Sequence, residues 1–143
     1  MSDTPMSGLV TFVLGDREYA TPLSAVREVV RLEGLTDLPG MTKPLAGVLD
    51  LRGTALPVLD LRLGADAGDR GDVLVMEAAS EENLVGVAVD RVRAVVGPGE
   101  LGQGGAAGDE LPSYVLEVLR GAGGPVFLVD LPRMVDAARQ SAS

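Results

Sequence analysis

The sequence predicts an all-β protein made of two similar five-stranded barrels packed together, with short helical turns and a C-terminal helix. Turn signals recur every few residues, because the 143 residues include 19 glycines and 9 prolines, and this favours many short strands. Residues 49–62 alternate apolar and polar side chains, as half-buried strands do. Two short sequence patterns also recur in the same order in both halves of the chain.

The first third of the chain predicts a hairpin, a helical turn and a loop. Residues 9–14 form the first expected strand, and a Gly-Asp turn returns the chain into 18–21. The segment PLSAVREVV then predicts one helical turn that leads into a strand, from the spacing of Leu23, Val26, Val29 and Val30. Residues 35–44 carry Pro-Gly and a further proline, so we expect a loop there.

Residues 49–62, LDLRGTALPVLDLR, predict an antiparallel hairpin. Leucines alternate with Asp50 and Arg52 in the first run, and with Asp60 and Arg62 in the second. Gly53 lies where a tight turn often needs a positive φ angle. Pro57 cannot donate a backbone hydrogen bond, so we expect the return strand at a sheet edge or a bulge.

The second half predicts further strands and one helix. Strands are expected at 73–76, 84–89, 92–96 and 125–129, and a helical turn or short strand at 112–120. The glycine-rich stretch 97–108 is expected to be a loop. A helix is predicted over 132–139, with Asp130 as its N-cap and Pro132 in its first turn.

An internal repeat predicts how the barrels divide the chain. Residues 26–30 (VREVV) match 92–96 (VRAVV) at an offset of 66, and 58–61 (VLDL) match 128–131 (LVDL) at an offset of 70. We therefore predict one domain over 8–138 made of two pseudo-repeated lobes, with the split near 64–72. Residues 1–7 and 139–143 are expected to be flexible termini.

The composition of the chain argues against several classes of function. The chain has 12 basic and 21 acidic residues, a net charge of −9, and neither cysteine nor histidine. An acidic surface disfavours nucleic acids and anionic membranes. Zinc fingers, disulfides and histidine-based triads need residues that are missing. The N-terminus lacks the basic and apolar regions of a signal peptide, and no apolar run could span a bilayer, so we expect a cytoplasmic location.

No enzyme motif stands out, and we expect no catalytic residues, metal or cofactor. Asp50 and Asp60 could in principle form a pair for acid–base catalysis, but each lies close to an arginine that favours an ion pair. Asp66, Asp69 and Asp72 lack the spacing of a calcium loop. The glycines between 99 and 104 lack the lysine of a phosphate-binding loop.

The hairpin resembles the signature of CheW-like domains, the adaptor modules of bacterial chemotaxis. The matching pieces are Gly47-Val48, Leu51-Arg52-Gly53 and the run 57–62, PVLDLR. The resemblance covers about 8–135 and implies two SH3-like barrels side by side with a C-terminal helix. One departure is Asp50, where the family usually has asparagine.

The resemblance also implies binding surfaces. In CheW-like proteins a helical receptor tip binds in a groove between the barrels, which by position would be lined or adjoined by Val26, Glu28, Val29, Val92 and Val95. A CheA-type histidine kinase would bind near Leu45, Val48 and Leu56. Arg52 and Gly53 are expected to stabilise the hairpin and to contribute to a binding interface. In a structural role, Arg52 would form an ion pair with Asp50 or Asp60. In a functional role, its guanidinium group would contact a partner protein.

The sequence thus leads to a non-catalytic adaptor that couples chemoreceptors to a CheA-type histidine kinase. Two alternatives remain at this stage. One is the scaffold of a chemosensory-type pathway that does not control motility, which would use the same surfaces. The other is a small β-barrel enzyme that uses the carboxylates of Asp50 and Asp60.

Overall fold

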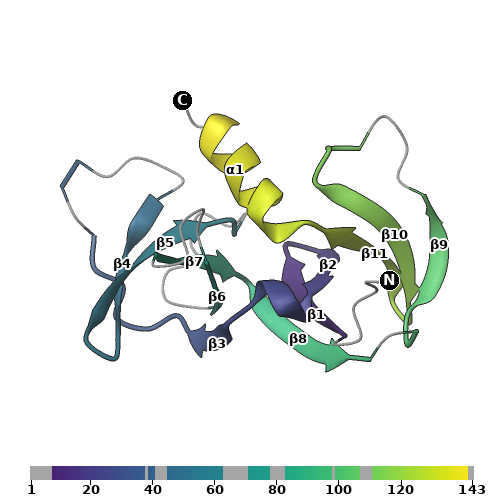
Figure 1. The fold of residues 1–143 in the computed structure, drawn as a ribbon, viewed down its shortest axis with the longest axis horizontal. Coiled ribbons are helices and arrows are strands. Elements are labelled where there is room, and N and C mark those ends of the chain that lie inside the picture. The colour runs from purple at the N-terminus through teal and green to yellow at the C-terminus, as the bar shows by residue number, and fades with distance from the viewer. Residues whose placement is uncertain are drawn as a thin grey trace.

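The computed structural model describes residues 8–37, 39–40, 45–62, 71–77, 83–97, 99–106 and 111–141. These residues form two antiparallel-rich sheets and a C-terminal helix (Figure 1). Sheet A has the strand order β8-β1-β2-β11-β10-β9, and sheet B has the order β3-β6-β7-β5-β4. The strands of sheet A are β1 (Leu9–Leu14), β2 (Arg17–Pro22), β8 (Arg91–Val96), β9 (Gly102–Ala106), β10 (Val115–Gly121) and β11 (Gly124–Val129). Those of sheet B are β3 (Glu28–Arg31), β4 (Leu45–Leu51), β5 (Thr54–Asp60), β6 (Asp72–Glu77) and β7 (Leu84–Val89).

The predicted fold class, two SH3-like β-barrels with a C-terminal helix, is confirmed, and one detail differs. Sheet B has the five strands that were predicted, whereas sheet A has six. The additional strand is β9, in the glycine-rich stretch that was expected to be a loop; it pairs antiparallel with β10. A strand of this kind is held through its backbone hydrogen bonds, so it leaves no apolar alternation in the sequence to reveal it.

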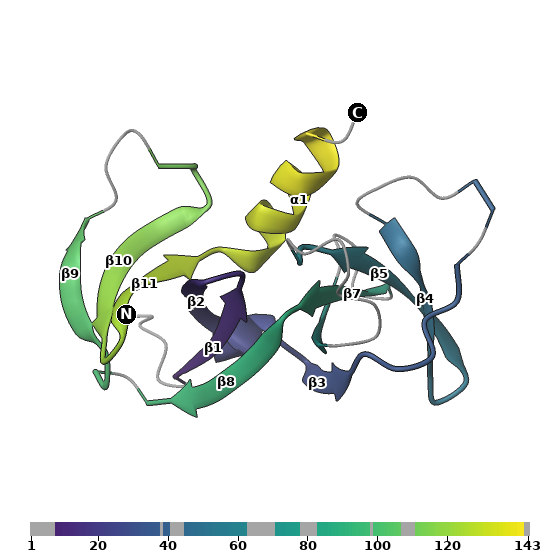
Figure 2. The ribbon, with the colours of Figure 1, turned by 180° about the vertical axis from the view of Figure 1, so that it is seen from behind.

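The two sheets do not divide the chain at the predicted 64–72 boundary. Hairpin β1–β2 comes from the first half of the chain but pairs with β8 and β11 of the second half. Conversely, hairpin β6–β7 pairs with β3 and β5 of the first half. Both views show β1 and β2 among the strands of sheet A, away from the sheet that holds β4 and β5 (Figure 2). The repeats have therefore exchanged hairpins.

The described residues form three apolar clusters, one in each sheet and one shared between the sheets. Strand β6 contributes to two of these clusters. Val73 and Val75 pack in the cluster of sheet B, whereas Leu74 and Met76 face the other way into the shared core. In β11, Val126 belongs to the cluster of sheet A and Val129 to the shared core. Alternate side chains of a strand thus serve different cores, which is why strands such as β6 and β7 read as continuous apolar runs.

All four aromatic side chains of the chain gather in the shared core. Phe12 is fully buried there, and Tyr19, Tyr114 and Phe127 pack against the same cluster. The Phe12 and Tyr19 rings are stacked with centroids 5.6 Å apart, and Tyr19 and Phe127 lie 5.8 Å apart. The largest side chains therefore fill the space between the sheets, and the two smaller clusters are aliphatic.

Helix α1 (Leu131–Ser141) covers one side of the shared core with Leu131, Met134 and Val135. Its predicted N-cap is confirmed, because the Arg133 backbone N–H donates to Asp130 Oδ1 at 3.2 Å. The helix extends to residue 141, so the prediction of a flexible terminus from 139 is wrong for 139–141. The predicted flexible segment 1–7 and residues 142–143 lie outside the described residues.

Candidate functional site

The signature hairpin β4–β5 turns on Arg52 and Gly53, whose φ angles are +50° and +88°. Two consecutive positive φ angles are what two-residue hairpin turns of matching twist require, and glycine adopts them without strain. Asp50 Oδ1 accepts a hydrogen bond from the Gly53 backbone N–H at 2.8 Å. The side-chain oxygen of asparagine could accept the same bond, so the departure from the family residue preserves this contact.

The turn directs Arg52 toward β3. Its Nη2 lies 2.6 Å from Glu28 Oε2, and its Nη1 lies 3.2 Å from Oε1, which makes a two-pronged ion pair. The hydrogen bonds from Arg52 hold the pKa of Glu28 below its ordinary value of 4.5, and those to Glu28 raise the pKa of Arg52. The expectation that Arg52 would pair with Asp50 or Asp60 is therefore wrong.

Asp60 has a different partner. Its carboxylate pairs with Arg62, whose Nη2 lies 2.8 Å from Oδ2 and whose side chain is 4% exposed. The two carboxylates considered for acid–base catalysis are thus engaged separately, Asp50 with the turn backbone and Asp60 with a buried guanidinium. This arrangement gives no support to an enzyme that uses them as a pair.

Strand β5 lies inside sheet B, between β7 and β4, so the edge position that Pro57 was expected to favour is wrong. The alternative was a bulge, and the facing strand β4 does shift register between Leu45 and Gly47, opposite Leu59 and Val58. Pro57 is opposite Val48, and Val48 directs its N–H and C=O outward to Thr36. The backbone of Pro57 therefore points away from β4, toward β7, whose pairing with β5 covers only 58–60. The missing N–H falls just beyond that ladder, so an interior position is tolerated.

The four valines expected to line the receptor groove divide into two pairs that match in the internal repeat. Val26 and its counterpart Val92 are half-buried against the shared core. Val29 and its counterpart Val95 are 42% and 62% exposed, on β3 and β8. These last two, called the edge valines below, occupy the edge strands of sheets B and A, which run along the same side of the molecule (Figure 1).

The expected kinase-binding residues do not share one surface. Leu45 is half-buried against the shared core, and Val48 helps line a concave surface of about 330 Å³ beside the hairpin turn. Leu56 is fully buried in the cluster of sheet B, because β5 lies inside the sheet and turns this side chain inward. Its assignment to a kinase-binding surface is therefore wrong. The concave surface is lined by Thr36, Val48, Leu49, Asp50, Gly53 and Ala55.

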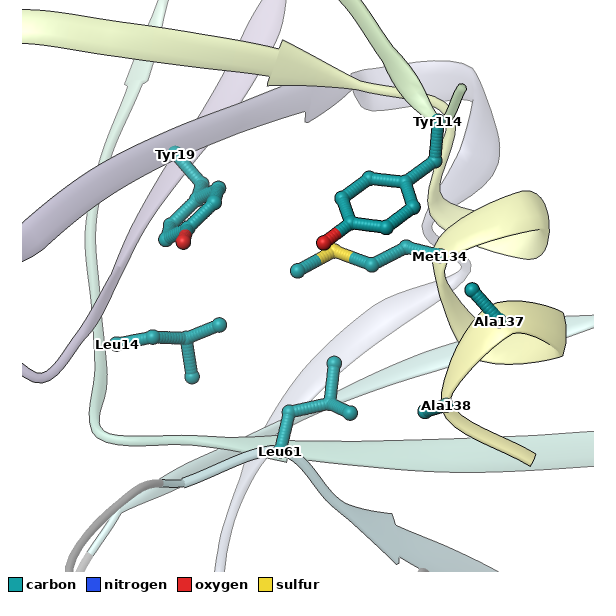
Figure 3. A pocket seen from close by; sticks show the side chains of 7 residues that line it. All are labelled: Leu14, Tyr19, Leu61, Tyr114, Met134, Ala137 and Ala138. Carbon is teal, nitrogen blue, oxygen red and sulfur yellow. The ribbon is translucent and has the colours of Figure 1, made fainter. Parts of the chain in front are cut away.

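A second cavity, of about 350 Å³, lies under α1 between the sheets. It could not be predicted from the sequence, because its lining comes from distant segments of the chain. Leu14 and Tyr19 line it from sheet A, Leu61 follows β5, and Met134 comes from the helix (Figure 3). The hydroxyl group of Tyr114 points toward the side of the cavity where Tyr19 lies. Partial burial, with a smaller contribution from Tyr19, raises the pKa of Tyr114.

The residues that the structure describes contain no cluster of three or more histidine, cysteine, aspartate or glutamate side chains suited to a metal ion. None of their helices combines the length and the apolar character needed to cross a bilayer.

The family model of the CheW-like domain matches residues 8–139, which is nearly the whole chain. The chain belongs to the CheW-like domain family. A crystal structure of the scaffolding protein TtCheW from Thermoanaerobacter tengcongensis has a similar fold, with a TM-score of 0.69 and 22% identity over 92% of this chain and 89% of that one.

Curated relatives support the membership of this CheW-like chain. It is 30% identical to a chemotaxis protein CheW of Helicobacter pylori over 61% of this chain and 54% of that protein. It is 33% identical to a chemotaxis protein CheW of Rhizobium meliloti over 62% of this chain and 59% of that protein. The chain therefore spans somewhat more than half the length of the curated relatives it matches.

Proposed function

We propose that this CheW-like chain is a non-catalytic adaptor that couples chemoreceptors to a CheA-type histidine kinase in a chemosensory complex. The observation that carries the proposal is the exposure of the edge valines. Repeat-equivalent residues stand exposed on the edge strands of both sheets, while their neighbours Val26 and Val92 help fill the shared core. Exposed aliphatic side chains that a fold does not need for its own core are typical of docking surfaces.

In this proposal the receptor's helical tip lies along β3 and β8 and contacts the edge valines, as an amphipathic helix contacts an apolar groove. The Glu28–Arg52 pair stands beside Val29 and holds the hairpin turn in place relative to β3. The kinase binds sheet B on the concave surface beside that turn, which includes Val48 and Gly53. The ion pair thus lies between the two partners' surfaces and fixes their relative position.

The test is co-sedimentation of the full chain with a receptor cytoplasmic fragment and a CheA-type kinase, with kinase activity as a second readout. Val29→Asp places a charge in the receptor surface and is expected to weaken receptor association by about tenfold or more. Leu116→Asp is the matched control, because Leu116 is 47% exposed on β10, close to the 42% of Val29.

Circular dichroism and thermal unfolding establish that both variants are folded. A folded Val29→Asp protein that still couples receptor to kinase fully would refute the receptor surface. Equal losses in Val29→Asp and Leu116→Asp would also refute it, because the effect would then not be specific to the edge valines.

A further inference from the structure

Arginines accompany the edge valines on both strands, in a protein whose net charge is −9. On β3 and just before it, Arg27 and Arg31 flank Val29 at alternate positions and are exposed with it. On β8, Arg91 and Arg93 precede Val95 and are also exposed. Four of the chain's 12 basic residues therefore lie in two short segments that also carry the edge valines.

Two of these arginines are available to a partner. Arg27 pairs with Glu77, and Arg93 Nη1 lies 3.2 Å from Glu18 Oε1. Arg31 and Arg91 have no ion-pair partner among the residues that the structure describes. Both are exposed, so a partner can reach their guanidinium groups.

Asp72 brings these two arginines to the junction of the sheets. Arg31 ends β3 and stands opposite Asp72 in the register of β3 with β6. Asp72 Oδ2 in turn accepts a hydrogen bond from the Val92 backbone N–H at 2.8 Å, next to Arg91 at the start of β8. The end of β3 is thus tied to the start of β8, and each of these two strands carries one edge valine.

We propose that the receptor helix docked here carries glutamate or aspartate residues beside its aliphatic stripe, and that these carboxylates engage Arg31 and Arg91. This inference rests on the adaptor function proposed above and specifies the chemistry of its partner. An exposed guanidinium offers a planar fork that matches a carboxylate, and it accelerates association with an acidic segment when salt is low. The net charge of −9 repels an acidic partner, so the attraction from Arg31 and Arg91 must outweigh this repulsion for the helix to bind.

Arginine on an edge strand also deters pairing with another chain, which would explain these residues without any partner. Replacement by glutamate separates the two roles. Arg31→Glu and Arg91→Glu keep a charged side chain on the edge strand, so they still deter pairing with another chain. They reverse the sign of the charge that faces a bound partner. Arg120→Glu, at an exposed position of β10, changes the net charge by the same amount and is the matched control.

The experiment uses two designed helical peptides with the same leucine stripe, flanked by glutamate in one and by lysine in the other. Binding to the full chain is measured by calorimetry at low and high salt, and backbone NMR locates the contact. The glutamate peptide is expected to bind about tenfold more tightly at low salt, with shifts at Val29 and Val95. Arg31→Glu and Arg91→Glu should remove that preference, and Arg120→Glu should retain it.

A lysine peptide that binds the unaltered chain as well as the glutamate peptide, or better, would overturn the inference. The same variants are then tested with the receptor cytoplasmic fragment. If the fragment binds both arginine variants as it binds the unaltered chain, with the same salt dependence, the inference fails while the adaptor function stands. If the fragment does not bind the unaltered chain, the proposed function itself fails.

Discussion

Sheet A and sheet B are two versions of one arrangement. The order β3-β6-β7-β5-β4 corresponds to β8-β1-β2-β11-β10, and in both the third and fourth strands pair parallel while the other neighbours pair antiparallel. The difference lies at the far edge. In sheet A, β9 covers β10, whereas in sheet B the corresponding β4 is the outermost strand, and on its outer side it forms a single β-bridge, to Thr36, among the residues that the structure describes.

The turns differ as well. The β10–β11 turn of sheet A consists of Ala122 and Gly123, while the β4–β5 turn of sheet B carries Arg52, bound to Glu28. The repeat position of Glu28 is Ala94 in sheet A, so that sheet lacks the acidic partner. One sheet thus has a covered edge and a plain turn, and the other has an open edge with a charged, anchored turn. The duplicated fold has kept its framework, whereas the charged, anchored turn is a feature of sheet B.

The variant with the largest expected loss of stability tests whether the two sheets unfold as one cooperative unit. Phe12 lies in the core that both sheets share, so Phe12→Ala is expected to cost about 3–5 kcal/mol and to weaken both sheets together. Urea unfolding gives the loss, and native-state hydrogen exchange follows β5 and β11 separately. Lost protection in β11 alone would mean that the sheets unfold independently.

The next prediction compares equivalent positions in the two small cores. Gly86 pairs with Val58 in sheet B, and Ala20 pairs with Leu128, the repeat counterpart of Val58, in sheet A. A Cβ atom on Gly86 would lie 2.7 Å from Val73 Cγ1. Gly86→Ala is therefore expected to destabilise the protein by about 1–3 kcal/mol in urea unfolding.

Ala20→Gly serves as the reciprocal variant, and its expected cost is about 0.5–1 kcal/mol. If Gly86→Ala is neutral, the cluster of sheet B has room for a methyl group and the two cores are packed alike.

The two turns allow a third comparison. Gly53 has a φ of +88°, so Gly53→Ala is expected to cost about 1–2 kcal/mol although nothing lies within 4 Å of the new methyl group. Gly123 has equally open surroundings without a positive φ, so Gly123→Ala should be neutral or slightly stabilising. Thermal unfolding of both variants measures the contrast, and equal melting temperatures would contradict it.

The smallest effect is the pH response of the anchored turn. The folded pKa of Glu28 is lowered, so the ion pair's stabilisation is present above the ordinary value of 4.5 and is lost as pH falls through the lowered pKa. An NMR titration should place the pKa of the Glu28 carboxyl below its ordinary value. Arg52→Ala should return its pKa toward the ordinary value, and an unchanged titration would show that Arg52 does not hold it.

Local features of the site could be predicted from the sequence. The alternation in 49–62 located the hairpin, Gly53 marked its turn, and Asp130 marked the start of the helix. The ion-pair partner of Arg52 could not be predicted in this way. Asp50 and Asp60 are near Arg52 in the sequence, whereas Glu28 is distant in the sequence and is brought to Arg52 by the tertiary fold. Leu56 was misplaced for a similar reason, since burial depends on which strands flank β5.

The sequence by itself determined the strand-rich class, the capped helix, the family and the existence of a repeat, because each depends on neighbouring residues or on periodicity. Only the tertiary structure decided that the repeats exchange hairpins, that a glycine-rich segment completes sheet A, and that Val29 stays exposed while Val26 is half-buried. Strand pairing joins backbones that are distant along the chain. Its choice is governed by the packing of the shared core, which no single segment encodes.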